Sequence, residues 1–470
     1  MISDWPLSHD SLLLVLTSHS KKKKTIKTKN NIIILAIALL TSCDVLEQSP
    51  TNNVSDSEVG ASASAAATLL NGAYHRLAAN NYYGGGYFTT SVALASDNTE
   101  WVGSYQFLGN FDQHNYQADN SANLSAWYSI YSAINAANQT IKLTSEASGI
   151  ADAEKNRIIA EATIIRSLGL FDLARTWGNI PIIKEATSSP TQFNGVKQSD
   201  AQTVYHTVIN DILSVKNDLA QPKTRGNAYI SQPVADAFLA RVYLYLEDWA
   251  NAEKYASQVI SQTDYYELVP ISDWLANKQT KESIFELVYS SSFSNEYYYY
   301  WQRAGGGRQE IGLSQEIFDL ISSPETGGDR AILVGDDSTP SERLLTAKLY
   351  WRDANDDDPA YVFRLAEQYL IRAEARAKLG DTAGAIADLN TIRQRSHVAD
   401  YNGSTAQTDV IAAIDQERRI ELAFEPHRWF DLVRTNRAVE VLGIDSHYTL
   451  FPIPNTDVLV DEDLEQNKGY

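Results

Sequence analysis

The residue types that most often perform catalysis occur in this 470-residue chain, but not at the spacings that catalysis requires. The eight histidines are scattered, and the sequence contains neither a His-Glu-x-x-His metal motif nor a Gly-x-Ser-x-Gly nucleophile motif. A single cysteine, Cys43, excludes a disulfide framework and cysteine-rich metal sites. We therefore expect a protein that is not an enzyme and that holds no cofactor or metal.

Carboxylates are the one reactive group present in excess. Paired carboxylates could support glycoside hydrolysis, but 57 acidic residues follow residue 42, so some pairs are inevitable. The acidic segment 353–358 begins like a calcium loop, yet it lacks glycine at its sixth position and has Arg364 at its twelfth. We expect a solvated acidic turn there.

Nucleotide and nucleic-acid binding are both disfavoured. The consecutive glycines Gly84, Gly85 and Gly86 lack the spacing of a phosphate loop and the Lys-Ser/Thr pair that follows one, so they predict a flexible turn. The net charge of −20 would repel a polyanion.

The N-terminus has the composition of an export signal. Six lysines lie within residues 21–29, and the nine apolar residues 32–40 are too few to span a bilayer. The sequence that ends at Cys43 resembles the bacterial lipobox, in which the cysteine carries the lipid. We predict that residues 1–42 are a signal peptide, extended at its N-terminus by a misassigned start, and that Cys43 is the lipidation site.

The segment that follows Cys43 predicts a tether. Residues 43–68 are rich in Ser, Asn and Ala and contain few apolar residues, which suits a linker between acyl chains and a folded body. Removal of residues 1–42 leaves 33 Lys and Arg against 57 Asp and Glu, a net charge of −24. Charge will therefore not hold the protein to anionic lipid.

Hydrophobic periodicity predicts amphipathic helices over residues 153–175 and 201–219. An internal repeat has an offset of 133 residues, because residues 240–252 align with residues 373–385. Both copies resemble the helix–turn–helix unit of tetratricopeptide repeats, whose units stack to bury their faces. Since the copies are far apart and imperfect, we expect a helical scaffold rather than a regular solenoid.

Two parts of the chain depart from this helical character. Residues 69–142 mix helical stretches with a loop-rich segment over residues 80–119, and residues 282–289 alternate like a strand. The strand opens a stretch rich in tyrosine and glycine, so residues 270–360 predict a loop-rich insertion on the helical body.

Six segments, spread in order over nearly the whole chain after residue 42, resemble the successive signatures of the SusD/RagB family: residues 43–50, 166–181, 364–375, 389–395, 417–434 and 452–470. One departure is Pro426, which stands where the family usually has glycine and should alter only a local turn.

This resemblance implies a mostly α fold, with a tetratricopeptide-like helical scaffold and a loop-rich half that binds the ligand. It divides the body into an N-terminal helical region (69–269), the insertion (270–360) and a C-terminal helical region (361–470). It also implies a surface-exposed, lipid-anchored outer-membrane protein of Bacteroidetes, which captures oligo- or polysaccharide and caps a SusC-like, TonB-dependent transporter. Peptide capture, as in RagB-like members, is the alternative, and a secreted glycosidase is disfavoured by the missing catalytic motif.

The strongest of these signatures has a structural explanation. Glu417, Glu421 and Glu425 lie four residues apart on one helical face, close to several arginines, which suits ion pairs between packed helices. The aromatic and apolar residues that follow should supply buried area at the helix end: Trp429, Phe430 and Leu432.

A glycan site needs aromatic rings for the C–H faces of sugars and polar side chains for their hydroxyls, presented by exposed loops. Two segments offer both. The first contributes Asp97, Asn98, Trp101 and Tyr105, and the second contributes Tyr298, Tyr300, Trp301 and Arg303. Tyr83 and Trp274 are reserve candidates. We expect these segments to form the ligand site.

Overall fold

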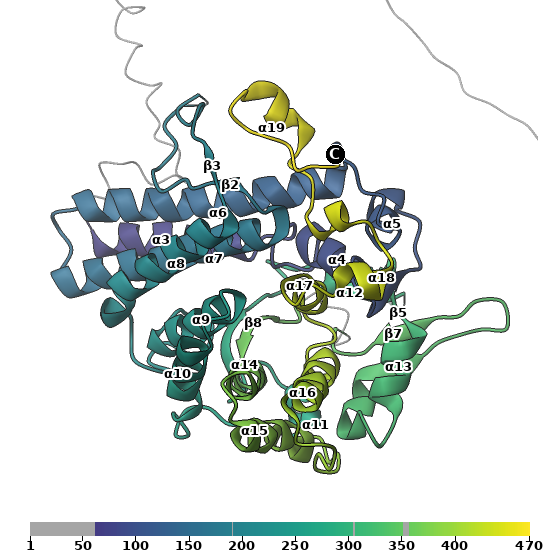
Figure 1. The fold of residues 1–470 in the computed structure, drawn as a ribbon. Helices are drawn as coiled ribbons and strands as arrows, with labels where there is room; N and C mark the ends of the chain where they lie inside the picture. Colours follow the sequence, from purple (N-terminus) through teal and green to yellow (C-terminus); the bar gives the residue numbers. More distant parts are fainter. Residues whose placement is uncertain (1–61, 190, 304–305, 351–356) are drawn as a thin grey trace, which may run out of the picture. The chain divides into compact units, whose positions relative to one another are not determined.

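The computed structural model describes residues 62–189, 191–303, 306–350 and 357–470. The chain separates into two units, Met1–Ser55 and Asp56–Tyr470, and everything below concerns the second. The predicted signal peptide, Cys43 and most of the acidic segment 353–358 lie outside the described residues. The described part is mostly helical, which confirms the expected fold class (Figure 1). No helix in it is long and apolar enough to cross a membrane.

Long helices form the N-terminal part of this body. Helix α6 (Ser121–Glu146) packs against α3 (Ala63–Leu77) and α7 (Asp152–Trp177), and α7 packs against α8 (Ala201–Val215) (Figure 1). Gly169 allows the close approach of α7 to α6, since a Cβ there would lie 2.7 Å from Cγ1 of Ile134. Both predicted helices are present, although α7 is buried on all faces from Ala160 to Trp177 and is therefore not amphipathic there. The second helix is α8, which ends in a 3₁₀ turn, η1 (Lys216–Asp218).

The internal repeat corresponds to two helical hairpins, α9–α10 (Gln232–Tyr245, Trp249–Ile260) and α14–α15 (Leu365–Lys378, Thr382–Arg395). Their turns match in detail. Asp248 accepts a hydrogen bond from the backbone N–H three residues later, and so does Asp381, which caps α15 in the same way. The preceding residue has positive φ in both, 56° at Glu247 and 93° at Gly380.

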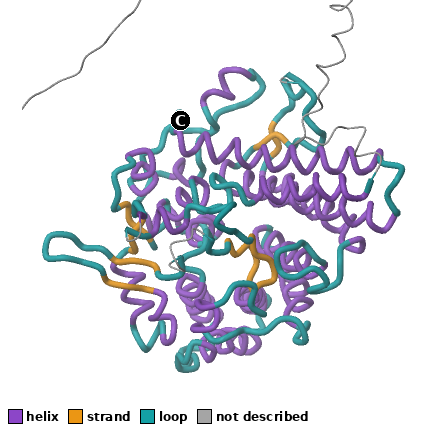
Figure 2. The backbone as a smooth tube through the Cα atoms, turned by 180° about the vertical axis from the view of Figure 1, so that it is seen from behind, coloured by secondary structure: helices purple, strands orange, loops and turns teal. Residues whose placement is uncertain are grey.

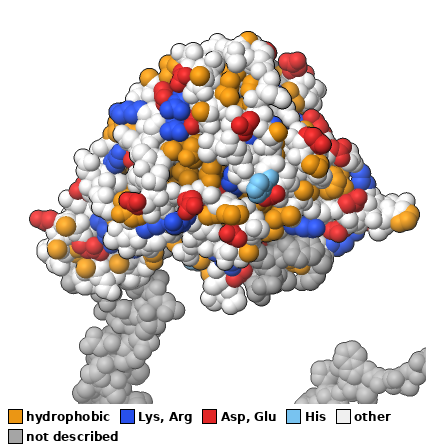
Figure 3. All heavy atoms as spheres, turned by 90° about the horizontal axis from the view of Figure 1, so that it is seen from below, with side chains coloured by type: hydrophobic (Ala, Val, Ile, Leu, Met, Phe, Trp, Pro, Cys, Tyr) orange, Lys and Arg blue, Asp and Glu red, His pale blue; other side chains and the backbone are white. Residues whose placement is uncertain are grey.

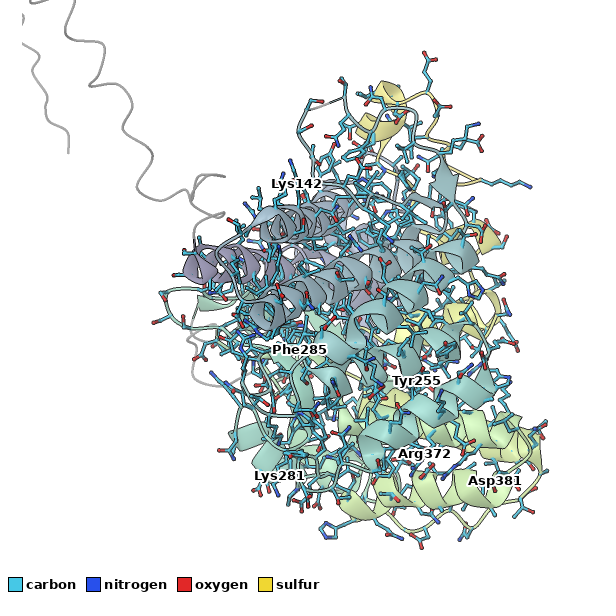
Figure 4. The ribbon with its side chains drawn as sticks, turned by 90° about the vertical axis from the view of Figure 1, so that its left-hand side faces the viewer. Lys142, Tyr255, Lys281, Phe285, Arg372 and Asp381 are labelled. Atoms are coloured by element: carbon cyan, nitrogen blue, oxygen red, sulfur yellow. The ribbon has the colours of Figure 1, made fainter. Side chains whose placement is uncertain are left out.

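The two hairpins are neighbours in space despite their separation in the sequence. Helix α10 packs against α14, and α14 also packs against α16 (Gln407–Glu421). Figure 4 shows this stack from the side, with Tyr255 on α10, Arg372 on α14 and Asp381 at the turn into α15. The stack is thus more regular than the sequence separation suggested, because the intervening residues leave it after α10 and return at α14.

The strands of the described residues form short two-stranded pairs between the helices (Figure 2). The predicted strand is β4 (Ser283–Leu287), which pairs antiparallel with β8 (Ala360–Arg364) at the base of the insertion. The remaining pairs, all antiparallel, are β1 with β5 (Thr99–Trp101, Ile311–Leu313), β2 with β3 (Ile180–Pro181, Gln198–Ser199) and β6 with β7 (Val334–Asp336, Leu345–Ala347).

The short helices lie mainly in the insertion and at the C-terminus. The first loop-rich segment contains α4 and α5 (Tyr87–Leu94, Gln106–Asp112), and the insertion contains α11, α12, α13 and η3 (Ile271–Ala276, Tyr297–Trp301, Gln315–Ser322, Gly328–Leu333). The chain ends with α17, α18, η5 and α19 (Arg428–Arg434, Ala438–Leu442, Ser446–Thr449, Asn455–Val460).

The glycine-rich turn before α4 is packed, so the prediction of a flexible turn is wrong. Gly84, Gly85 and Gly86 are all buried. Gly85 has φ +82°, and a Cβ there would lie 2.5 Å from the backbone nitrogen of Tyr297. Glycine is required at this position because the turn and α12 are in direct contact.

A buried ion network joins the insertion to the C-terminal helices. The guanidinium of Arg364, at the end of β8, contacts carboxylate oxygens of Glu282 (2.6 Å), Glu421 (3.1 Å) and Glu425 (2.7 Å). Arg330 of η3 pairs with Glu417 at 2.5 Å and with Glu421 at 3.2 Å. The predicted role of the three glutamates as ion-pair partners is confirmed, and so is the burial of Trp429, Phe430 and Leu432.

Burial and the neighbouring charges shift the pKa values of the ionisable groups in this network. Burial alone would raise the pKa of Glu421, but the guanidinium groups of Arg395, Arg364 and Arg330 outweigh burial and lower it to about 2. At Glu425 burial outweighs the attraction of Arg364, so the pKa of its carboxyl is raised. The carboxylates in turn hold the pKa of Arg364 well above its usual value despite complete burial.

Replacement of Arg364 tests whether this network supports the fold. Arg364→Met leaves Glu282, Glu421 and Glu425 close together without their shared cation, and we expect the free energy of unfolding to fall by about 3–5 kcal/mol. Urea denaturation followed by circular dichroism measures this change. Lys281→Met is the matched control, since its exposed pair with Glu267 should contribute at most about 1 kcal/mol. Equal losses in the two variants would contradict the structural role of Arg364.

Candidate functional site

The two segments predicted to form the ligand site are brought together by a strand pair. Strands β1 and β5 are antiparallel, with Thr99 opposite Leu313 and Trp101 opposite Ile311. The pairing continues beyond the strands, because the N–H of Val102 donates to the carbonyl of Glu310 at 3.0 Å. The surface next to this pair therefore contains side chains from both segments, and also from α4.

Four partly exposed rings form an aromatic cluster on this surface: Tyr87, Tyr105, Phe107 and Tyr299. Tyr105 and Phe107 stack with ring centroids 5.1 Å apart, and Tyr87 meets Phe107 edge to face at 5.6 Å. The side chain of Tyr105 interacts with that of Tyr299 and raises the pKa of the Tyr299 hydroxyl. The cluster thus joins residues that are up to 212 positions apart in the chain into one apolar platform.

A buried carboxylate fixes the loop that carries this cluster. One oxygen of Glu310 accepts hydrogen bonds from the backbone N–H groups of Ser104 (3.0 Å) and Tyr105 (2.9 Å), and from the indole Nε1 of Trp101 (3.0 Å). Its other oxygen accepts from Nε of Arg308 at 2.5 Å. The Glu310 side chain is fully buried, so it holds the rings in place without reaching the surface itself.

Arg308 adds a cation to the platform. Its guanidinium carbon lies 3.5 Å from the centroid of the Tyr105 ring, a cation–π contact. Its side chain remains one-third exposed, and it also hydrogen-bonds the hydroxyl of Ser104. Glu310 raises the pKa of Arg308, so the guanidinium stays charged.

Four of the predicted site residues retain some exposure: Trp101, Tyr105, Arg303 and Asp97, whose partners are described below. Trp101 is partly buried, and its ring lies against Gly109, where a Cβ would come within 2.6 Å of it. Tyr105 belongs to the aromatic cluster. Arg303 is exposed and forms a bidentate pair with Glu342 at 2.7 and 2.9 Å. A ligand-binding role stays a prediction for all the residues that the sequence analysis named.

The other predicted residues do not have the exposure that the sequence analysis assumed. The side chains of Trp301, Tyr298, Tyr300 and Asn98 are buried, with relative exposures of 3%, 6%, 3% and 1%. Trp301 packs on Tyr350, with ring centroids 5.8 Å apart. In the five-residue helix α12 only Tyr299 turns toward solvent, because the other rings point into the core.

Asp97, Asn98 and the two reserve candidates have structural partners. Asp97 pairs with Arg428 at 2.7 Å and with Arg419 at 3.0 Å, and these arginines outweigh its partial burial and lower its pKa. Asn98 accepts a hydrogen bond from Arg419 at 2.8 Å. Tyr83 is buried and donates to Asp172, while Trp274 is buried beneath Arg364.

Sequence reasoning missed Tyr87, Phe107, Tyr299, Arg308 and Glu310. Tyr299 is the neighbour of two residues that were predicted, but its direction could not be inferred from a run of four tyrosines and a tryptophan. Within the described ranges, no group of three or more His, Cys, Asp or Glu side chains is arranged to hold a metal ion.

Comparison with known proteins gives consistent matches. A family model described as "SusD family" matches residues 341–449, and one described as "Starch-binding associating with outer membrane" matches residues 44–244. The chain is 23% identical to SusD-like protein P38 of Formosa agariphila, over 93% of this chain and 98% of that protein.

Solved structures share the fold. A SusD superfamily protein from Bacteroides vulgatus superimposes with a TM-score of 0.78 at 21% identity, covering 87% of this chain and 99% of the other. A structure described as a laminarin-binding SusD-like protein superimposes with a TM-score of 0.76 at 24% identity, with the same coverage of both chains.

Proposed function

Because the chain belongs to the SusD/RagB family, whose proteins bind without catalysing a reaction, we propose that it captures oligo- or polysaccharide at the outer membrane and delivers it to a SusC-like, TonB-dependent transporter. The proposed ligand site is the aromatic cluster with Arg308. The proposal includes attachment of the protein to the outer membrane through a lipid on Cys43.

The observation that carries the proposal is the partly exposed platform of Tyr87, Tyr105, Phe107 and Tyr299. Flat C–H faces of sugar rings stack on such rings, and sugar hydroxyls need polar partners beside them. The Arg308 side chain is one-third exposed beside the rings. The half-buried Glu296, which accepts a hydrogen bond from Asn80 at 3.2 Å, lies next to Tyr297 at the start of α12. The starch and laminarin in the names of the matched family and structure support neutral glucans as the first ligands to test.

Loss of a single platform ring should weaken glycan binding without unfolding the protein. We expect Tyr299→Ala and Tyr105→Ala to lower affinity for the bound polysaccharide by roughly 10- to 100-fold, since a stacking ring contributes about 1–3 kcal/mol by analogy with bases stacked on aromatic side chains. Native gel retardation with laminarin and starch identifies the ligand, and isothermal titration calorimetry measures the affinity.

Trp301→Ala is the contrasting variant. Its ring is buried, so its removal should lower the free energy of unfolding by about 3–5 kcal/mol, whereas Tyr265→Ala, at a tyrosine 41% exposed elsewhere, should change neither property. Binding by Tyr299→Ala and Tyr105→Ala at wild-type affinity would exclude the cluster as the site. Binding of peptides but of no polysaccharide would favour the RagB-like alternative.

The anchor makes a separate prediction. Cys43→Ala should give an unacylated protein that no longer sediments with outer membranes, because the body has a net negative charge and no helix among its described residues can cross a bilayer. Metabolic labelling with an alkyne fatty acid, followed by membrane fractionation, measures both properties. Unchanged labelling and sedimentation of the variant would contradict a lipid on Cys43.

Delivery to a transporter requires a physical complex. Gentle detergent extraction of native outer membranes should recover this protein together with a β-barrel partner through an interface of standard size or larger. Affinity purification followed by native mass spectrometry identifies the partner by its mass. Recovery of the protein alone, at full yield and under conditions that keep other outer-membrane complexes intact, would contradict the delivery role.

A further inference from the structure

A second aromatic recess lies on another part of the body, between α6, the β2–β3 hairpin and α19. Its volume is about 440 Å³, within the range of small-ligand sites. Figure 1 and Figure 2 place α19 and the hairpin on the same side of α6. The walls are mainly apolar and aromatic, and they include Tyr128, Tyr131 and Phe193.

Two carboxylates hold the three walls together. Asp457 of α19 accepts hydrogen bonds from Nε1 of Trp127 at 2.7 Å and from the hydroxyl of Tyr128 at 2.6 Å. Asp461 accepts from the backbone N–H of Gly195 in the hairpin, at 3.4 Å. Tyr128 is 47% exposed although its hydroxyl is fixed, so its ring is a preformed platform whose rotamer entropy is already lost.

The charges on the walls limit the ligand. Asp457 and Asp461 line the recess, and none of the described lining residues is Lys or Arg. The chain as a whole carries a net charge of −20. An anionic ligand would be repelled. Carboxylate oxygens accept hydrogen bonds only, so a ligand with many hydroxyl donors and a flat apolar face satisfies both the rings and the acids.

We propose that this recess is a second binding site for neutral oligosaccharide, formed by Tyr128, Phe193 and Asp461. The inference rests on the proposed glycan-binding function and adds to the aromatic cluster a second point of attachment. Side chains of both charges are interspersed on the face drawn in Figure 3, whereas the charged residues that line this recess are both acids.

The recess and the aromatic cluster are both attached to the N-terminal half of α6. The side-chain nitrogen of Asn120, the N-cap of α6, donates to the carbonyl of Phe107 in the aromatic cluster at 2.8 Å. Tyr128 lies eight residues farther along the same helix, about 12 Å by helical rise. Two weak sites on one polymer would raise the affinity for polysaccharide above that for a short oligosaccharide.

Calorimetry with laminaritriose and maltotriose, and with their parent polysaccharides laminarin and starch, tests the second site. We expect the wild-type protein to bind two molecules of one trisaccharide, Tyr128→Ala and Tyr299→Ala to bind one each, and the double variant to bind none. Tyr128→Ala should also lower the affinity for the parent polysaccharide by about 100-fold, because it removes one of the two linked contacts.

Further variants separate stacking from folding. Tyr128→Phe keeps the ring and should retain both sites, Asp461→Asn should weaken the second site by about 10-fold because an amide oxygen is a poorer acceptor, and Tyr265→Ala should bind like the wild type.

Each contrary result has a distinct meaning. A wild type that binds neither glucan would overturn this inference and would exclude neutral glucans as the captured ligand, while the proposed function fails only if no polysaccharide binds. Two trisaccharides bound by a folded Tyr128→Ala protein, or a blocked Phe-Lys-Phe peptide bound in the recess to the exclusion of sugar, would overturn the second site alone.

Discussion

Burial of charge is the constraint on which this structure depends. Arg364 is fully buried, and such a cation is tolerated only when carboxylates surround it and fill its hydrogen-bonding positions. The carboxylates come from three separate places: Glu282 before β4, Glu421 at the end of α16, and Glu425 in the turn that follows. One side chain therefore links the base of the insertion to the C-terminal helices. Glu421 stabilises the fold above the unfolded pKa of about 4.3, and this contribution is lost as pH falls toward its folded value of about 2. The raised pKa of Glu425 has the opposite effect on stability, because its carboxyl is harder to ionise in the folded protein than in the unfolded chain.

The same principle extends from the scaffold to the candidate site. Arg428 and Arg419 neutralise Asp97 and fix the chain just before β1, and Glu310 fixes the chain just after it. Asp97, Asn98 and Glu310 are thus buried or half-buried positioning residues, and the rings beside them remain at the surface. Polar residues near a binding loop need not touch the ligand, because an exposed aromatic platform requires a rigid support.

The presence of helices, strands and the repeat could be predicted from the sequence. The contacts between distant helices and the direction in which single side chains point could not. The existence of the long helices, of the strand at 283–287 and of the repeat could be inferred from the pattern of apolar residues, although β4 and most of α7 are buried on all faces. The contact between α10 and α14 has no such signal, because about a hundred residues intervene. Trp301 and Tyr299 differ by two positions in an all-aromatic helix, so composition gives no indication of which ring faces solvent. Glu310 is a lone acid in the sequence, and its importance comes from three donors that are more than 200 residues away.

The openness of both candidate sites bears on the kind of ligand that they suit. An enclosed cavity would admit only the end of a polymer, whereas the aromatic cluster lies on the surface and the recess beside α6 is open to solvent. Partly exposed tyrosines also bury less ligand area than a closed pocket would, so each contact is modest and reversible. The proposed delivery to a transporter would require this property, because tight binding at one site would slow the transfer. Several weak contacts along one chain give retention of the polymer together with rapid exchange at each contact.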